Sequence, residues 1–425
     1  MRFILYGMGY GTGILYALRR DGYDAGYIYD KENIKPIDKK YTDKVIKSWG
    51  GEVYNTDDIT DDDVLIVDDI VNDDKKWKDV KAKMTGNEYA DKLENEREFF
   101  MSEANKIGIK TGKFFEFDNF DDGIEFVKNE GGEWVIKLNG EMTEKWTTYV
   151  SKSADDMIDF IQFLKKFYGK NNVSFILQEK INGIEVALTK WNDAYFINFE
   201  YKNFMKMSRY KTGEMGTLVK RIPADTSIVK ESKINELYKL IREHGDYNAP
   251  LDINMIINED GAFALEPTSR WGYPIGSILM AGYNGDIGIM FIKAINGDSF
   301  ADDFTDKWMV GIVLATPPFP YSIKNEADNL KLGGIPINDS KITDKHNVIW
   351  EGIYKDGDVW RTAFGGYNAV VTGIGDTIEA ANHQANAEIE NINLPLSFWR
   401  TDIGLPDREN IIKLKKLGYL EDEKW

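Results

Sequence analysis

The first thirty residues alternate between apolar runs and glycines in an order that predicts a βαβ unit. Phe3–Tyr6 is an apolar run, glycines follow at alternate positions, and Ile14–Arg20 has helical periodicity before the apolar run Ala25–Tyr29. A further apolar run, Val64–Val67, ends in two aspartates. Because runs of this length are typical of buried parallel strands, we predict a small doubly wound domain over residues 1–90.

A mixed pattern of helices and strands follows, from residue 91 to about residue 300. Gly108 is placed to end the first of these helices as a left-handed C-cap. Two apolar runs, Leu251–Ile257 and Ala262–Glu266, flank Asp260-Gly261, which predicts a hairpin. The other predicted elements are helices at 94–106 and 155–168 and strands at 113–117, 134–138, 173–179, 184–188 and 195–199.

The last part of the chain, residues 301–425, predicts a small mixed domain. Its expected elements are strands at 308–315, 348–354 and 369–373 and a helix at 377–389. The pattern as a whole predicts a multidomain protein of the α/β and α+β classes.

Composition narrows the classes of function. A chain of 425 residues with 42% hydrophobic content can bury several cores. The formal net charge of −18 argues against a nucleic-acid or anionic-membrane surface, because phosphates would be repelled over most of the molecule. There is no cysteine, which excludes thiolate nucleophiles and disulfides. The first apolar run is too short for a signal peptide or membrane span, so we expect a soluble cytoplasmic protein.

The glycine turn GMGYGTG favours a ligand that approaches the backbone closely, at the start of a helix. A dinucleotide fingerprint fails on spacing, since its last glycine position holds Thr12 or Ile14. Two interpretations stay open, a phosphate or small ligand bound by Gly9 and Gly11, and a turn that serves the fold alone.

Separate segments of the chain resemble glycinamide ribonucleotide synthetase, which is also called phosphoribosylamine–glycine ligase, and they occur in the family's order. They are GIKT with the strand WVIK, then ILQEKINGIEV, KTGEMGT and LEPTSRWG, and finally GIGDTIEAA and FWRTDIG near the end of the chain. The resemblance covers residues 90–404. It implies a Rossmann-like N-terminal domain that helps to bind phosphoribosylamine, a two-lobed ATP-grasp unit, and a small C-terminal domain.

The resemblance also implies an ATP site. Phosphoryl transfer needs cations on the phosphates and a slot that orients the adenine. Glu185 would accept the ribose hydroxyls, and the loop GEMTEKW, at 140–146, replaces the family's glycine-rich loop. The residues that match ATP-contacting positions are Arg97, Lys137, Lys145, Gln178, Glu179, Ile181 and Glu185.

Metal and substrate positions follow in the same way. Mg²⁺ prefers oxygen ligands that it shares with ATP phosphates, and Mn²⁺ is an alternative ion. Glu266 matches the family's first ligand and Thr268 replaces its asparagine, while Asp252 and Asn254, on the predicted partner strand, are candidate compensating ligands. The expected substrate contacts are Gly9, Gly11, Gly213, Met215, Gly216 and Arg270, and Arg270 and Lys145 are the expected catalytic cations.

The implied activity is ATP-dependent joining of phosphoribosylamine to glycine in purine biosynthesis, or a variant of it. Tyr273, Pro274 and Ile275 stand where the family has an acidic DPE segment, which favours a ligase for a different amino acid or amine. A nucleotide-binding relative without turnover is a third alternative. The expected partners are small molecules, an amino acid and an amine, with no nucleic acid and no membrane, and the expected assembly is a monomer or homodimer.

Overall fold

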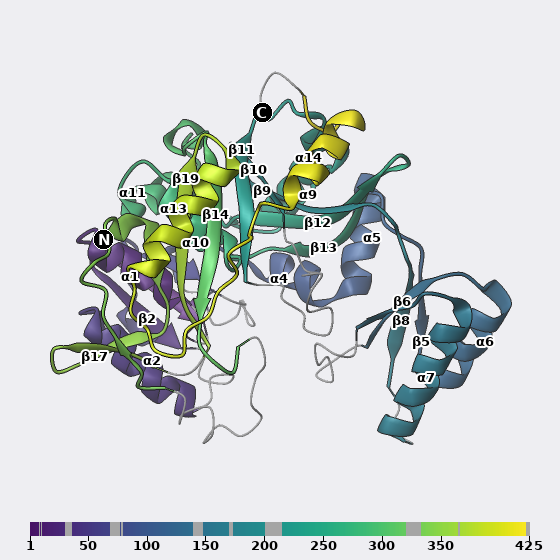
Figure 1. Cartoon of the computed structure of the whole chain (residues 1–425), viewed down its shortest axis with the longest axis horizontal. Coiled ribbons are helices and arrows are strands. Elements are labelled where there is room, and N and C mark those ends of the chain that lie inside the picture. Colours follow the sequence, from purple (N-terminus) through teal and green to yellow (C-terminus); the bar gives the residue numbers. More distant parts are fainter. Residues whose placement is uncertain are drawn as a thin grey trace.

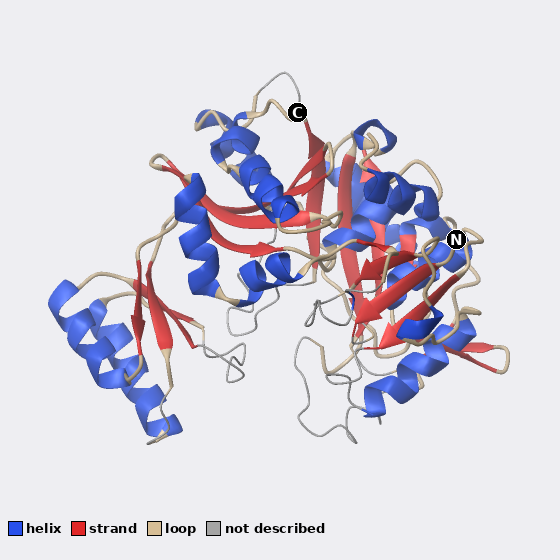
Figure 2. Cartoon of the chain, turned by 180° about the vertical axis from the view of Figure 1, so that it is seen from behind, coloured by secondary structure: helices blue, strands red, loops and turns tan. Residues whose placement is uncertain are grey.

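Four β-sheets and their flanking helices make up the part of the chain that the structure, a computed structural model, describes (Figures 1 and 2). The described residues are 1–7, 9, 11–29, 36–68, 77, 80–138, 148–169, 173–199, 215–319, 333–363 and 366–421, with the backbone alone at 36–38.

The N-terminal sheet has the order β2-β1-β3-β4, and its strands are parallel, as the sequence predicts. Side chains of β1 pack on both faces, since Leu5 belongs to the main core and Tyr6 to a second cluster. The helix α1 begins directly after the glycine turn. The elements are β1 (Phe3–Gly7), α1 (Thr12–Arg20), β2 (Ala25–Tyr29), α2 (Pro36–Ser48), β3 (Val64–Val67) and β4 (Lys83–Met84).

An eight-stranded antiparallel sheet forms the centre of the molecule, in the order β13-β12-β9-β10-β11-β14-β19-β16. It contains strands from both sides of residue 300, so the division of the chain into 1–90, 91–300 and 301–425 stays a prediction. The strands are β9 (Ile184–Trp191), β10 (Ala194–Phe199), β11 (Gly216–Ile222), β12 (Leu251–Asn258), β13 (Gly261–Thr268), β14 (Trp308–Ala315), β16 (Val348–Trp350) and β19 (Tyr367–Gly375).

A small lobe with its own hydrophobic core lies at the far right of Figure 1, beyond α5 and the ends of β12 and β13. Its sheet has the order β5-β8-β6-β7 and is covered by two helices. The elements are β5 (Phe114–Phe117), α6 (Phe120–Glu130), β6 (Trp134–Leu138), β7 (Tyr149–Val150), α7 (Ala154–Tyr168) and β8 (Phe175–Glu179).

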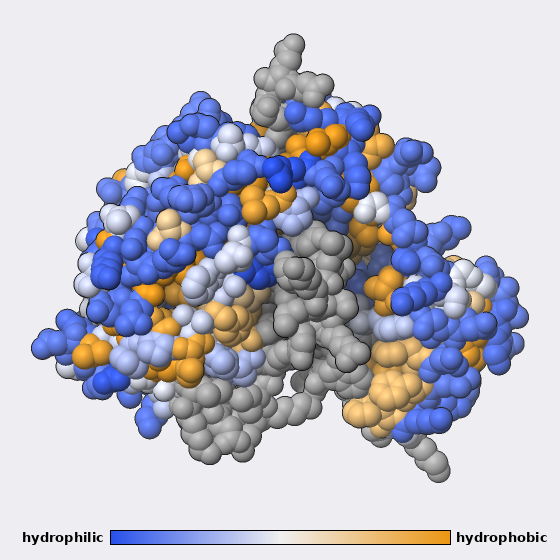
Figure 3. Space-filling view, viewed as in Figure 1, coloured by the Kyte–Doolittle hydropathy of each residue, from blue (hydrophilic) through white to orange (hydrophobic). Residues whose placement is uncertain are grey.

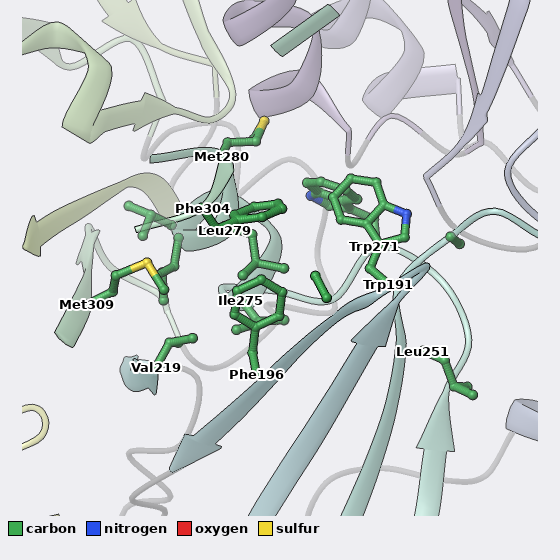
Figure 4. Close-up of a cluster of buried hydrophobic side chains, with 14 of the residues drawn as sticks. Trp191, Phe196, Val219, Leu251, Trp271, Ile275, Leu279, Met280, Phe304 and Met309 are labelled. Atoms are coloured by element: carbon green, nitrogen blue, oxygen red, sulfur yellow. The ribbon is translucent and has the colours of Figure 1, made fainter. Parts of the chain in front are cut away.

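The main core lies between the large sheet and the helices that pack on it. Figure 4 shows part of this core, in which the rings of Trp191 and Trp271 meet edge to face at 5.4 Å. The helices are α4 (Glu88–Asn95), α5 (Arg97–Ile107), α8 (Ser227–Glu231), α9 (Ile234–Glu243), α10 (Ile275–Gly282), α11 (Ile287–Asn296), α13 (Ile378–Glu390) and α14 (Asp407–Lys416). A three-stranded sheet consists of β15 (Pro336–Ile337), β18 (Val359–Thr362) and β17 (Ile353–Asp356), and 3-10 turns lie at Thr56–Asp58, Ala301–Asp303 and Lys345–Asn347.

Two predicted elements are each divided in the structure. The helix predicted at 94–106 is two helices, because Glu96 is extended at φ −106° and ψ 92°. The strand predicted at 348–354 is interrupted because Glu351 turns into the interior and Gly352 takes the left-handed φ of 55°. The predicted C-cap Gly108 and the hairpin of β12 and β13 are confirmed.

The face of the molecule in Figure 3 is mostly hydrophilic. Hydrophobic colour also gathers on the small lobe, where α7 exposes Phe163 and Phe167. Among the described helices, each is too short or too polar to span a bilayer.

Candidate active site

One face of the large sheet carries polar side chains from neighbouring strands. Asn254 of β12 lies opposite Glu266 of β13, and Asp252 lies opposite Thr268. Directly opposed residues of antiparallel strands point to the same side of a sheet, as do residues two apart on one strand. The register therefore puts these four oxygen-bearing side chains, which are the candidate metal ligands, on one face.

The ribose-binding candidate Glu185 lies on this same face. It is on β9 opposite Ile256, which is two residues beyond Asn254 on β12. Glu185 is half-buried. The polar face therefore extends over three adjacent strands.

Two cations from different parts of the chain approach Glu266. The Nη2 atom of Arg97, the first residue of α5, is 2.8 Å from Glu266 Oε2. Lys137 lies on β6 of the small lobe, and its Nζ atom is 4.0 Å from the same oxygen. The side chains of Arg97 and Lys137 are 24% and 19% exposed, and that of Glu266 is 43% exposed. The small lobe and the large sheet thus meet at a carboxylate flanked by two positive charges.

One nitrogen of Arg97 has capacity for a further contact. Its Nη1 atom is buried and has no hydrogen-bond partner in the described part of the chain. A buried donor without a partner is costly, so a ligand oxygen at this point would be favourable.

The predicted adenine position lies where β8 ends. Gln178 is buried, and its Nε2 atom has no hydrogen-bond partner among the described residues. The next residue, Glu179, is exposed, and its amide donates to the carbonyl of Lys113 at 2.8 Å. Ile181 is half-buried and packs near Gly112, where an added Cβ would be 3.0 Å from its Cδ1. The three candidates are therefore adjacent to the connection between the two lobes.

Arg270 follows directly from β13 and is held against α4. Its Nη2 atom is 3.0 Å from Glu94 Oε1, and the other oxygen of Glu94 accepts the amide of Ser269 at 2.8 Å. The guanidinium is thus fixed a few residues beyond Glu266, at the edge of the polar face.

The remaining candidates divide into two groups. Met215 is buried in a small apolar cluster with Val313 and Ala315, and Gly216 begins β11 with a φ of 143°, where an added Cβ would be 2.4 Å from a backbone carbonyl. Both residues therefore have a packing role, and their contact with substrate stays a prediction. Lys145 and Gly213, like the loop at 140–146, lie outside the described residues.

The glycine turn makes contacts that the sequence did not indicate. The amide of Gly9 donates to the hydroxyl of Tyr27 at 2.7 Å, and that of Gly11 to Asp68 Oδ2 at 2.7 Å. The amide of Gly13 donates to Glu351 Oε2 at 2.7 Å. Side chains of the protein thus accept backbone amides of the turn that the sequence predicted to bind a ligand.

Asp68 and Glu351 are both buried beside the first turn of α1. Burial raises the pKa of Glu351 to about 8, and the charge of Asp68 adds to this, against hydrogen bonds that lower it. Burial also raises the pKa of Tyr27 well above its ordinary value, with Asp68 and Tyr273 contributing. The sequence pointed to Asp68, which is a carboxylate directly after an apolar strand. It gave no such indication for Glu351, because Glu351 and Gly13 of α1 are 338 residues apart in the sequence.

The donor set of the polar face fits a magnesium ion that is shared with ATP. In the described part of the chain, no group of three or more His, Cys, Asp or Glu side chains is arranged around a common point. Mg²⁺ commonly takes one or two protein carboxylates and completes its shell with phosphate oxygens and water. Glu266 with Asp252 and Thr268 on the same face can supply that number.

Comparison with known proteins agrees with this geometry. Residues 95–275 match the family model of the phosphoribosylglycinamide synthetase ATP-grasp (A) domain. A phosphoribosylamine–glycine ligase of Fusobacterium nucleatum is 24% identical over 398 residues, which cover 89% of this chain and 91% of that protein. Residues 95–275 thus form an ATP-grasp domain of the phosphoribosylglycinamide synthetase type, and most of the chain is similar to phosphoribosylamine–glycine ligases. The chain is thereby related to the ATP-grasp ligases that form carbon–nitrogen bonds.

Solved structures show that the chain has the ATP-grasp fold, as predicted. The phosphoribosylamine–glycine ligase of Thermotoga maritima superposes with a TM-score of 0.68 at 18% identity, over 95% of this chain and 100% of that chain. An L-amino acid ligase from Bacillus licheniformis superposes with a TM-score of 0.55 at 9% identity, over 94% and 99%.

Proposed function

We propose that the chain is an ATP-dependent ligase that joins a carboxylate to an amine through an acyl phosphate. The observation that carries this proposal is the approach of Arg97 and Lys137 to Glu266, from the helix before the small lobe and from the small lobe itself. Phosphoryl transfer depends on cations fixed around the transferred group, and these charges are fixed before the nucleotide arrives.

The nucleotide would lie between the lobes. Gln178, Glu179 and Ile181 would hold the adenine, and the buried Nε2 atom of Gln178 supports this because it lacks a partner among the described residues. Glu185 would accept the ribose hydroxyls. This orientation places the terminal phosphate toward the cations of the polar face.

Phosphate oxygens would then replace Glu266 as the acceptors of Arg97 and Lys137. Lys145 is expected to join them. Glu266 would be released to hold Mg²⁺, or Mn²⁺, with Thr268 and Asp252 nearby. The ion would supply charge that offsets the negative charge of the phosphates.

The reaction would take place in two displacements. A carboxylate oxygen of the first substrate attacks the γ-phosphorus, the bond to the β-phosphate oxygen breaks, and ADP leaves. The nitrogen of the amine then attacks the acyl carbon, phosphate leaves, and the nitrogen loses a proton to give the amide. Arg270, fixed by Glu94, would bind the substrate carboxylate.

Phosphoribosylamine and glycine are the substrate pair that the family resemblance indicates, and with them a role in purine biosynthesis. A second candidate is a ligase for a different amine or amino acid. It is favoured because side chains of the protein accept the amides of Gly11 and Gly13. The turn that contains these glycines would otherwise help to bind the phosphorylated amine. A relative without turnover is disfavoured, because it would not require Arg97, Lys137 and Glu266 to converge.

ADP release from purified protein tests the proposal. Mg-ATP is incubated with a panel of amino acids crossed with a panel of amines, including phosphoribosylamine, and amide products are sought by mass. We expect ADP and an amide in equal amounts with at least one pair. ATP that stays intact with every pair would refute the ligase.

A further inference from the structure

The first turn of α1 is occupied by two carboxylates of the protein itself. Asp68, which follows β3, accepts the amide of Gly11 at 2.7 Å. Glu351, which follows β16, accepts the amide of Gly13 at 2.7 Å and the hydroxyl of Thr12 at 3.0 Å. These contacts use the amides and hydroxyl that would otherwise bind an anion at this helix end.

The absence of side chains at the glycines of the turn leaves room for these carboxylates. A Cβ at Gly7 would lie 1.6 Å from Asp68 Oδ1, and one at Gly11 would lie 2.6 Å from Asp68 Oδ2. A Cβ at Gly13 would lie 2.0 Å from Glu351 Oε1. Glycines at these positions allow a close approach to the backbone, and the groups that approach are Asp68 and Glu351.

Glu351 is also fixed from the other side. Ser277, in α10, lies 3.5 Å from its Oε1 atom, and the amide of Gly352 donates to the hydroxyl of Thr12 at 3.0 Å. The carboxylate is therefore bound by the N-terminal domain and by α10 and is 6% exposed. A ligand cannot displace it without breaking these contacts.

A phosphate at this helix end would meet two carboxylates in a buried site. The amides of Gly11 and Gly13 and the hydroxyl of Thr12 already have these acceptors, so none of the three donors would be left for the phosphate. Segment 266–277 connects this region to the polar face, since it begins at Glu266 and reaches Ser277 beside Glu351. The region is thus within one short segment of the proposed acceptor site.

We propose that Glu351, with Asp68, excludes phosphate from the N-terminal end of α1, so that the amine used by this ligase carries no phosphate there. The substrate class is an unphosphorylated amine in place of phosphoribosylamine. This inference rests on the proposed ligase function, and it names Glu351 as a specificity-determining residue.

Calorimetric titration with ribose 5-phosphate and with inorganic phosphate tests the inference. The full chain is first saturated with adenylyl imidodiphosphate, so that the nucleotide face is filled. We expect no saturable binding of either phosphate to the unaltered protein. Glu351→Ala should show saturable binding of ribose 5-phosphate, because the amide of Gly13 and the hydroxyl of Thr12 lose their internal acceptor.

Three further variants separate loss of the acceptor from loss of folding. Asp68→Ala frees the amide of Gly11 and should shift in the same direction if Glu351→Ala does not fold. Glu351→Gln keeps an acceptor oxygen in place and should not gain phosphate binding. Glu388→Ala removes another buried carboxylate, which accepts the amide and hydroxyl of Thr343 and lies in α13, and it should not gain phosphate binding.

Two results would overturn the inference. One is ribose 5-phosphate binding that does not differ between the unaltered protein and folded Glu351→Ala or Asp68→Ala. The other is ADP release that phosphoribosylamine supports better than every unphosphorylated amine. If the ATP analogue does not bind and no amine supports ADP release, the ligase proposal fails, while the titration with ribose 5-phosphate still decides the role of Glu351.

Discussion

The polar face of the large sheet and the N-terminal end of α1 both bring carboxylates close to hydrogen-bond donors, but they suit opposite ligands. Glu266 is 43% exposed and is paired with two side-chain cations, which in the proposed function exchange it for phosphate oxygens. Glu351 is bound by a backbone amide and by hydroxyls and is 6% exposed. A glycine turn at the start of a helix therefore does not by itself make a phosphate site, because carboxylates of the protein can accept its amides.

Loss of Lys137 should have the largest effect. Lys137→Ala removes one of the two cations beside Glu266, and we expect ADP release to fall by about 100-fold or more, the range for loss of one group that stabilises transition-state charge. The rate at saturating ATP measures this. Lys165→Ala is the matched control, since Lys165 is in the same lobe and pairs with Asp121 at the surface. Equal rates for the two variants would contradict a role in phosphoryl transfer.

Glu266→Gln should affect the metal requirement more than nucleotide binding. The amide keeps the shape but is a poorer magnesium ligand, so we expect the Mg²⁺ concentration for half-maximal rate to rise by about tenfold or more. The measurement is ADP release against Mg²⁺ concentration at fixed ATP. An unchanged magnesium dependence would mean that Glu266 forms ion pairs with Arg97 and Lys137 but does not bind the metal.

Gly13→Ala should destabilise the N-terminal end of α1. The new Cβ would lie 2.0 Å from Glu351 Oε1, and overpacking of this kind costs about 1–3 kcal/mol in the free energy of unfolding. Denaturant unfolding measures it. In a Glu351→Ala background the same substitution should cost much less, because the atom that it meets is absent. Equal costs in both backgrounds would show that the two residues do not contact.

The pH dependence of stability should show a smaller change for each pH unit. The pKa of Glu351 is about 8 in the folded protein, against an ordinary value near 4.5. The folded state therefore holds a proton that the unfolded state releases, and this contribution to stability is full below about pH 4.5 and is lost by about pH 8. Relative to Glu351→Gln, the unaltered protein should lose about 1 kcal/mol per pH unit between pH 5 and 7. Parallel unfolding curves for the two proteins would contradict the raised pKa.

Local patterns were enough to predict much of the fold. The βαβ opening and the hairpin of β12 and β13 each depend on neighbours in sequence, and both were predicted. The helix α10 was not, because its eight residues are buried all round and have no polar face to give a periodic signal. The break at Glu96 likewise has no strong local mark.

Some residues of the candidate site could likewise be predicted from the sequence, and others could not. Arg97, Lys137 and Glu266 were identified through resemblance, and the structure brings them together although they are far apart in sequence. Glu351 could not be identified, because its contact with Gly13 joins opposite ends of the chain. The glycines of the turn suggested a phosphate, since the sequence marks a close approach to the backbone but not which group approaches.

Transfer of ¹⁸O tests the acyl phosphate most directly. The carboxylate substrate that gives an amide in the panel is labelled with ¹⁸O in its carboxyl group, and the inorganic phosphate is analysed after complete turnover. We predict that each phosphate carries one ¹⁸O atom, because the carboxylate oxygen that attacks the γ-phosphorus leaves with it. Unlabelled phosphate formed alongside the amide would contradict an acyl phosphate and, with it, the proposed mechanism.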